Sequence, residues 1–265
     1  MSEDWYRELI VDLAAERADL RALVGPLPDE AWDAPTPAPG WAVRDVVYHL
    51  AFFDDAAADS ILRPEEFARH KSAMAARRDP AADHPAAAAA RTPGQLLGDW
   101  DRAHGRLLEG LGRLGGRERV EWYGPQMSAG SFATARLMET WAHGQDVVDA
   151  LELARPPSDR IRHIVHLGVI TRGWTFANRG LAPDDTPVLV ELTSPSGQPW
   201  TWGPEDAADR VEGTALDFAL VVTQRRNVAD TGLAVTGEAA ARWMAVAQCF
   251  AGPATERAPR HQPAS

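Results

Sequence analysis

Apolar residues recur at helical spacing along the first 155 residues of the chain. The pattern predicts one helix over residues 3–24 and a second over residues 42–62, with a Pro-rich loop between them. A third helix begins after Thr92, whose side chain can cap it, and continues to about Leu114. A fourth covers residues 131–153. Because only one connection among these helices is long, the pattern predicts an antiparallel four-helix bundle.

The remaining segments differ in character. Residues 63–91 are rich in Ala, Pro and Arg, and they predict either a short helix or a mobile connection. Residues 159–181 predict a fifth helix, and residues 187–194 alternate as a strand does before the turn signal Pro195-Ser196-Gly197. Beyond this turn we expect strands over 198–202, 208–213 and 233–237 and helices over 214–224 and 238–250. These elements predict a small α+β domain.

The chain therefore divides into four predicted parts. We expect a helix bundle over residues 1–155, a connecting helix over 156–185 and the small α+β domain over 186–252. Residues 253–265 predict a disordered tail. The fold class is thus a two-part α plus α/β protein.

Composition excludes several classes of protein. The 265 residues are 45% hydrophobic, which argues against intrinsic disorder, and the formal net charge of −11 disfavours nucleic acid or an anionic membrane as partner. No apolar run approaches the ~20 residues of a membrane span, and the acidic N-terminus is unlike a signal peptide. The single cysteine, Cys249, permits no internal disulfide, so we expect a cytoplasmic protein. The sequence leaves the oligomeric state open.

Two of the predicted helices carry residues that can bind a metal. Glu139, His143 and Asp146 share one stripe of the fourth helix, although a polar row that faces water has the same spacing. In the second helix, His49 lies among apolar residues and is therefore expected to face the bundle interior. A lone buried histidine is commonly bonded to a carbonyl or hydroxyl group. If His49 lies opposite Glu139 and His143, however, two imidazoles and a carboxylate form a three-ligand divalent site with open positions.

The choice of metal stays open at this point. Two histidines and one carboxylate suit zinc, and the same set is the facial triad of non-haem iron. Nickel and manganese are further alternatives. We predict zinc, with iron as the second choice.

The segments GWAVRDVVYHLAFFD (40–54) and ETWAHGQDVVDAL (139–151) resemble the metal-binding bundle of the DinB-like superfamily. The closer resemblance is to the mycothiol-dependent maleylpyruvate isomerase family. The resemblance implies that His49, Glu139 and His143 are the metal ligands. The segments VLVELTSPSGQPWTWG, VEGTALDFALVVTQRR and LAVTG resemble the small C-terminal domain of the same family, which is similar to sterol-carrier folds.

The resemblance implies that the protein is a thiol-dependent isomerase or S-transferase that acts on a small molecule. Mycothiol would be the thiol cosubstrate, bound through its sulfur to the metal. In the resembled family an arginine of the second domain reaches the active site, and Arg225 is the candidate here, with a guanidinium suited to a substrate carboxylate. Asp146 is a candidate acceptor for the ring of His143. The alternatives are a non-catalytic module that binds metal or a small ligand, and a metal-dependent hydrolase. The sequence does not identify the substrate.

Overall fold

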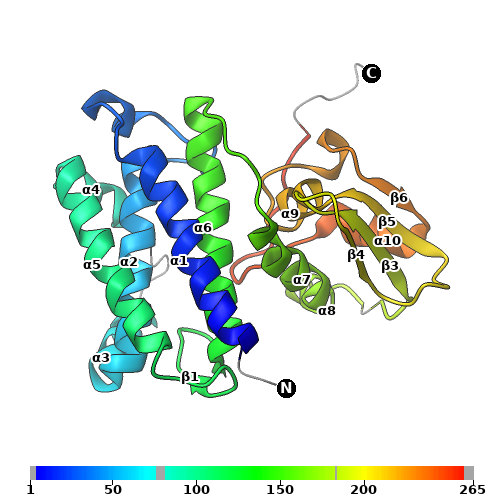
Figure 1. Cartoon of the computed structure of the whole chain (residues 1–265), viewed down its shortest axis with the longest axis horizontal. Coiled ribbons are helices and arrows are strands. Elements are labelled where there is room, and N and C mark those ends of the chain that lie inside the picture. The colour runs from blue at the N-terminus through cyan, green and yellow to red at the C-terminus, as the bar shows by residue number, and fades with distance from the viewer. Residues whose placement is uncertain (1–3, 76–80, 183, 260–265) are drawn as a thin grey trace. The chain divides into compact units, whose positions relative to one another are not determined.

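Four long helices form the first of two units, residues 1–154 and 155–265, into which the chain divides. The computed structural model describes residues 4–75, 81–182 and 184–259 (Figure 1). The helices of the bundle are α1 (Asp4–Val24), α2 (Val43–Leu62), α5 (Pro93–Leu111) and α6 (Ala129–Leu151). The two-part architecture predicted from the sequence is confirmed.

The helices run up, down, down and up. The short helices α3 (Pro64–Ala75) and α4 (His84–Ala89) lie in the long connection between α2 and α5, with residues 76–80 outside the described part of the chain. Because this connection returns the chain to the end where α2 begins, α2 and α5 are parallel neighbours, while α2 and α6 run antiparallel (Figure 1). Of the two alternatives predicted for residues 63–91, a short helix or a mobile connection, the described part of the segment contains two helices.

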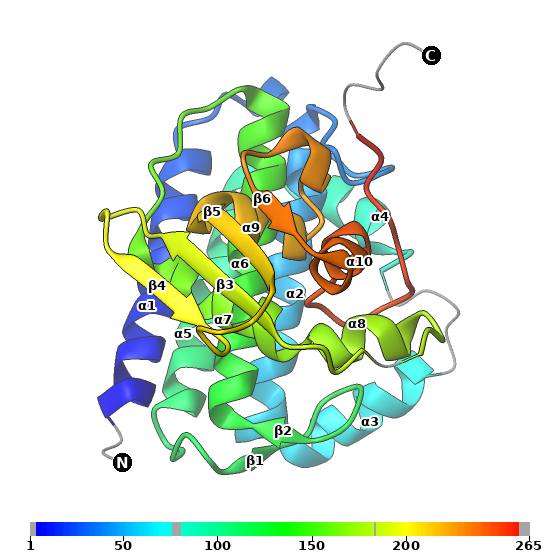
Figure 2. The ribbon, with the colours of Figure 1, turned by 90° about the vertical axis from the view of Figure 1, so that its right-hand side faces the viewer.

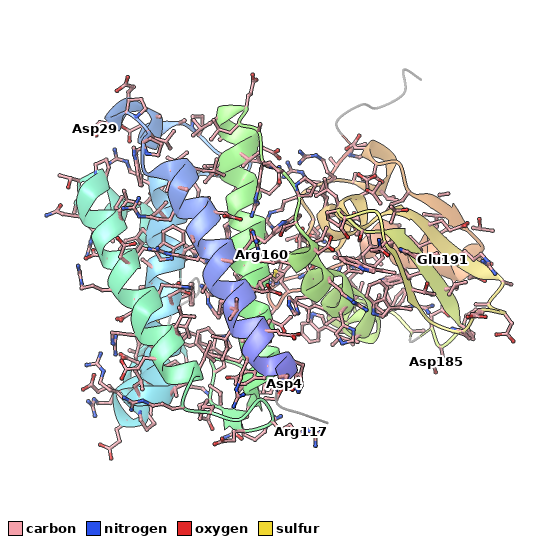
Figure 3. The ribbon with its side chains drawn as sticks, in the orientation of Figure 1. Asp4, Asp29, Arg117, Arg160, Asp185 and Glu191 are labelled. Carbon is pink, nitrogen blue, oxygen red and sulfur yellow. The ribbon has the colours of Figure 1, made fainter. Side chains whose placement is uncertain are left out.

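The bundle core lies between α2, α5 and the ends of α1 and α6. Side chains fill the space between the helices, with Asp4 and Asp29 near opposite ends of the bundle (Figure 3). One cluster of buried residues comprises Leu20, Val24, Trp32, Val43, Val46, Val47, Leu50, Ala51, Leu96, Leu97, Trp100 and Val147. Trp32 comes from η1 (Asp29–Asp33), a 3₁₀ helix in the loop after α1. The Thr92 cap is present, because its hydroxyl accepts from the Gln95 amide at 3.3 Å.

Two segments differ from the predicted elements. The loop before α6 contains a small hairpin of β1 (Arg119–Val120) and β2 (Met127–Ser128), and α6 begins at Ala129 rather than at residue 131 because Ser128 caps it. Residues 159–181 form three pieces instead of one helix, namely η2 (Asp159–Ile161), α7 (Arg162–Ile170) and α8 (Arg172–Asn178). The Thr171 hydroxyl, which bonds back to the Leu167 carbonyl at 2.7 Å, lies at the break between α7 and α8.

The second unit is built on a four-stranded mixed sheet in the order β4-β3-β5-β6 (Figure 2). Its strands are β3 (Val188–Thr193), β4 (Pro199–Trp202), β5 (Asp209–Thr214) and β6 (Ala234–Thr236). β3 and β5 are parallel, and the other pairs are antiparallel. Val190, Leu192 and Val211 are buried on one face, and Glu191 pairs with Arg210 on the other, where Leu189 of β3 is also buried.

Helices complete the second unit. α9 (Ala215–Val222) packs on β5, and α10 (Glu238–Val246) packs on β5 and β6; the 3₁₀ helix η3 (Val228–Asp230) lies between them in the chain. Residues 253–259 have no regular secondary structure, but the Thr255 and Arg257 carbonyls accept hydrogen bonds from Gln224 and Asn227. Residues 260–265 of the predicted tail lie outside the described residues. No helix in the described ranges has the length and apolarity that crossing a membrane requires.

Candidate metal centre

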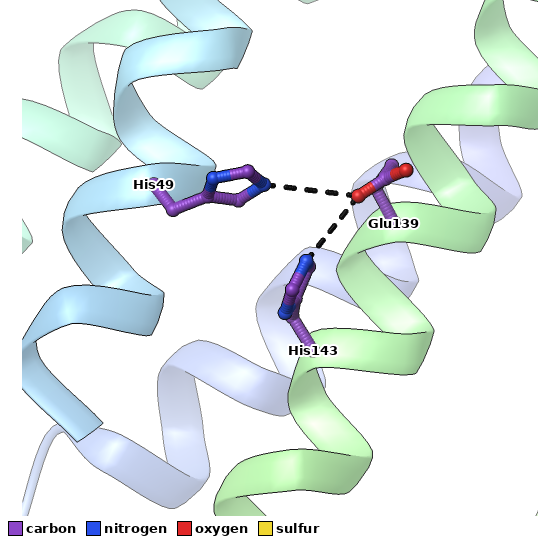
Figure 4. Close-up of side chains that lie close together, drawn as sticks. All are labelled: His49, Glu139 and His143. Atoms are coloured by element: carbon purple, nitrogen blue, oxygen red, sulfur yellow. Dashed lines mark ion pairs between the residues drawn. The ribbon is translucent and has the colours of Figure 1, made fainter. Parts of the chain in front are cut away.

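Three side chains from two helices converge in the interior of the bundle (Figure 4). The Nε2 atom of His143 lies 3.3 Å from Oε2 of Glu139, and Nε2 of His49 lies 3.7 Å from the same oxygen. One ligand atom from each residue lies within 4.8 Å of the other two. Within the described residues this is the one such group of His, Cys, Asp or Glu. The structure thus brings together the three residues predicted as ligands, and their binding of a metal remains a proposal.

The local structure around each residue explains this arrangement. α6 carries Glu139 and His143 four residues apart, so they stack on one face of the helix. α2 approaches from the opposite side and begins where the Asp45 carboxylate accepts from the Ala42 amide at 2.7 Å. His49 follows one turn later, so it is held on a well-formed part of the helix.

Burial controls the electrostatics of the cluster. The exposed fractions of the side chains are 12% for His49, 29% for Glu139 and 14% for His143. Burial lowers the pKa of His49 to about 3, and the nearby charge of His143 adds to this effect against the opposing influence of Glu139. Burial raises the pKa of Glu139, but its interactions with the rings of His143 and His49 outweigh it and hold that pKa well below its usual range. The cluster therefore contains an ionised carboxylate beside a neutral imidazole.

Asp146 lies behind His143. Its Oδ2 atom is 3.2 Å from Nδ1 of His143, on the side of the ring away from Glu139, and the residue is only 4% exposed. An acceptor at Nδ1 keeps the proton there and leaves the lone pair on Nε2, which faces His49 and Glu139. The alternative in which this polar row faces water does not agree with the burial of these side chains.

The donor set fits a divalent cation. Zinc bonds nitrogen and oxygen ligands at about 2.0–2.2 Å, so two ligands of a tetrahedral ion stand about 3.3 Å apart. The two separations from Glu139, 3.3 and 3.7 Å, are close to that spacing, and the third pair of ligand atoms lies within 4.8 Å. Both ring nitrogens of His49 are buried, and neither has a hydrogen-bond partner among the described residues, as expected where one of them serves as a metal ligand. The same set suits iron.

Aromatic residues surround the cluster, and sequence reasoning did not assign them a role. The Trp41 ring stacks on His143 at a centroid distance of 5.6 Å and lies 4.8 Å from the His49 ring. Phe53 packs on His49 at 4.7 Å, and the buried His84 lies 5.4 Å from it. Trp41 was visible in the motif at residues 40–54, but His84 lies in a segment without a pattern.

Two further aromatic residues lie in the loop before α6, and the candidate Arg225 lies in the second unit. Trp122 stacks on Phe67 at 5.8 Å, and the Tyr123 hydroxyl lies 3.2 Å from Nδ1 of His70. Burial raises the pKa of Tyr123 above its usual range. Arg225 belongs to the second unit, where it is half-buried and donates to the Thr223 carbonyl at 2.7 Å. Its role at the metal cluster stays a prediction.

Two family models match the chain. The model described as the mycothiol maleylpyruvate isomerase N-terminal domain matches residues 13–148, a range that contains all three converging side chains. A second model, described as wyosine base formation, matches residues 184–236 in the second unit.

Two relatives and two solved structures are similar to most of this chain. Two proteins of Mycobacterium tuberculosis, from strains CDC 1551 / Oshkosh and ATCC 25618 / H37Rv, are 48% identical over 245 residues, which is 92% of this chain and 95% of theirs; both are described as uncharacterized. The crystal structure of a mycothiol-dependent maleylpyruvate isomerase matches 87% of this chain and 92% of its own, with a TM-score of 0.58 and 15% identity. A histidine-to-alanine mutant of such an isomerase matches with a TM-score of 0.54 and 15% identity, over 82% of this chain and 88% of its own. At this identity the likeness establishes the fold.

Proposed function

Because this chain belongs to the mycothiol maleylpyruvate isomerase N-terminal domain family, we propose that it is a metal-dependent enzyme that uses a small thiol, mycothiol, to isomerise or to thiolate a small molecule. The observation that carries this proposal is the convergence of His49, Glu139 and His143 on one point. Three protein ligands leave coordination positions open for an outside group, which a closed structural site does not. A thiol cosubstrate needs a reducing compartment, so the proposal places the protein in the cytoplasm.

Each residue of the centre has a role in this proposal. Two neutral imidazoles and one carboxylate would hold the cation, and Asp146 would orient His143 through its Nδ1 atom. A divalent cation held there, most simply zinc, would lower the pKa of a coordinated thiol or water. The rings of Trp41 and Phe53 cover the histidines and would limit the access of bulk water.

The chemistry suits a substrate with a double bond conjugated to a carbonyl group. The thiol sulfur bonds to one alkene carbon while the π-electron pair moves onto the carbonyl oxygen, and the former double bond rotates. When the electron pair returns, the carbon–sulfur bond breaks and the thiol is regenerated, so the net reaction is an isomerisation. If the adduct is instead protonated on carbon and released, the same first step gives S-transfer. We propose Arg225 of the second unit as the group that binds a carboxylate of the substrate.

Elemental analysis of the purified protein tests the metal ligands. We expect about one divalent ion per chain in the wild-type protein and loss of that ion in His49→Ala, because two remaining ligands hold a cation weakly. His166→Ala is the matched control, since His166 is an exposed histidine of α7 in the second unit. A full complement of metal in His49→Ala would remove the basis of the assignment.

A cobalt-substituted protein tests the thiol. Addition of mycothiol should change the visible absorption of bound cobalt if sulfur enters the coordination sphere, and thiol-dependent turnover of a conjugated acid should follow. Hydrolysis of esters or amides without any thiol would favour the metal-dependent hydrolase instead. Tight capture of a small ligand with neither response would favour a binding module.

A further inference from the structure

A second buried polar cluster lies beside the metal centre and joins three helices. Asp54 of α2 is fully buried, and its Oδ1 atom accepts from Nε and Nη2 of Arg136 in α6, at 3.1 and 2.9 Å. Its Oδ2 atom accepts from Nε1 of Trp100 at 3.1 Å and lies 3.1 Å from Nδ1 of His104, both in α5. Arg136 is itself only 4% exposed.

The position of this cluster matches that of the metal centre along the two helices. From His49 to Asp54 the chain advances five residues along α2, a rise of about 7.5 Å. From the midpoint between Glu139 and His143 back to Arg136 is also five positions along α6, again about 7.5 Å. Because α2 and α6 run antiparallel (Figure 1), these equal steps place the ion pair and the ligand cluster at two matching levels along the α2–α6 pair.

We propose that the Asp54–Arg136 pair is a positioning device that sets the register of α2 against α6, so that His49 faces Glu139 and His143. This inference rests on the proposed metal centre. A slip of α2 by one helical turn would displace His49 by about 5.4 Å and separate it from the other two ligands. Nε and Nη2 of Arg136 both donate to one oxygen of Asp54. This pairing fixes the distance and the direction between the two side chains, which an apolar contact does not. Polar groups in helical interfaces are best attested in this role of specifying register.

A pair that acted through stability alone, or through charge alone, would behave differently from a positioning pair. If the pair served only the stability of the bundle, its loss would lower the unfolding temperature and leave the metal affinity of the folded protein unchanged. If it acted only through charge, removal of the positive Arg136 would strengthen cation binding and removal of the negative Asp54 would weaken it. Positioning predicts weaker binding for both changes.

The experiment compares Arg136→Gln and Asp54→Asn with the wild-type protein. Zinc affinity of the apoprotein is measured by competition with a chromophoric chelator, and folding is followed by circular dichroism at a temperature where each variant is native. We expect each variant to bind zinc about 10-fold more weakly, at the lower end of the range for groups that hydrogen-bond a metal ligand, because the pair acts on His49 only through the packing of α2 and α6. Arg136→Lys, which keeps the charge but offers a single ammonium group, should fold and show an intermediate loss.

Trp100→Phe is the matched control. It removes one hydrogen bond from the same carboxylate on the α5 side and leaves the α2–α6 pair intact, so it should lower stability without changing zinc affinity. The positioning role would be overturned if folded Arg136→Lys and Asp54→Asn bound zinc with wild-type affinity, or if Arg136→Gln bound zinc more tightly. Either result would leave the metal centre in place. If the wild-type protein itself takes up no divalent metal, the proposed function and this inference both fail.

Discussion

Replacement of Asp146 tests the metal centre through a residue that does not itself bind the metal. The carboxylate lies 3.2 Å from Nδ1 of His143 and is 4% exposed, so water cannot take its place when it is changed. Asp146→Asn keeps the volume and one acceptor but loses the charge, and a charge-assisted hydrogen bond is roughly twice as strong as a neutral one. Asp146→Leu keeps the branching of the side chain with somewhat larger terminal groups and removes the acceptor altogether.

The expected magnitudes follow from this difference. Partners that orient a ligating histidine contribute about 10- to 100-fold to metal affinity, or about 1.4–2.8 kcal/mol. We expect Asp146→Asn to lie near the lower end of that range and Asp146→Leu near the upper end. The free energy of unfolding of the apoprotein should change less than that of the zinc-loaded protein, because the change acts on the bound state as well.

The assay is a zinc titration of the apoprotein in competition with a chromophoric chelator at fixed pH and ionic strength. Asp149→Asn provides the control, since Asp149 lies on the same helix and receives a hydrogen bond from Gln145 at 2.9 Å. It should bind zinc as the wild-type protein does. Equal zinc affinity in Asp146→Leu and the wild-type protein would refute the role given to Asp146 and would weaken the assignment of His143 as a ligand.

Three further predictions concern the second unit, a helix cap and the buried ion pair. Arg225→Gln should raise the KM for an anionic substrate and leave the metal content unchanged; an unchanged KM would remove Arg225 from the proposed site. Thr92→Ala removes the hydroxyl that accepts from the Gln95 amide and should lower the free energy of unfolding by about 1 kcal/mol in a urea titration. Burial raises the pKa of Asp54, but the charge of Arg136 outweighs it and lowers that pKa below its usual value. The carboxylate therefore contributes stability above the unfolded-state pKa of about 3.9 and loses it as the pH falls further. The stability difference between wild type and Asp54→Asn should thus be about 3–5 kcal/mol at neutral pH and shrink below about pH 4, and a difference independent of pH would contradict this.

The long helices and the first hairpin of the sheet could be predicted because their signals are local. Thr92 and Gln95 form the expected capping box, and Gly197 has the positive φ of 84° that the turn between β3 and β4 requires. The break between α7 and α8 lies at Thr171, whose hydroxyl donates to the Leu167 carbonyl. A hydrogen bond of this kind leaves no clear mark in the hydrophobic pattern of the sequence. The two-residue strands of the β1–β2 hairpin are too short to show alternation.

The candidate site could be predicted only in part from the spacing of residues along the sequence. Spacing alone placed Glu139, His143 and Asp146 on one stripe, but it could not say whether that stripe faced water or protein. α6 packs against both α1 and α2, so it is buried on more than one face, and its polar stripe lies inside the bundle. The partners Asp54 and Arg136 belong to helices that are distant in sequence, and only the tertiary structure joins them.

The charges inside the bundle give an independent reason to expect a divalent cation. Asp54 and Arg136 cancel one another, and His49, at a pKa of about 3, is neutral at physiological pH. With histidines counted as neutral, Glu139 and Asp146 leave the metal centre with a formal charge of −2 in a largely buried setting. Buried carboxylates are costly unless they are paired, and a bound divalent cation brings the formal sum to zero. The same reasoning predicts that Glu139→Gln and Asp146→Asn each lower the thermal unfolding temperature of the zinc-loaded protein more than that of the apoprotein, whereas in a purely structural polar network the two forms would respond equally.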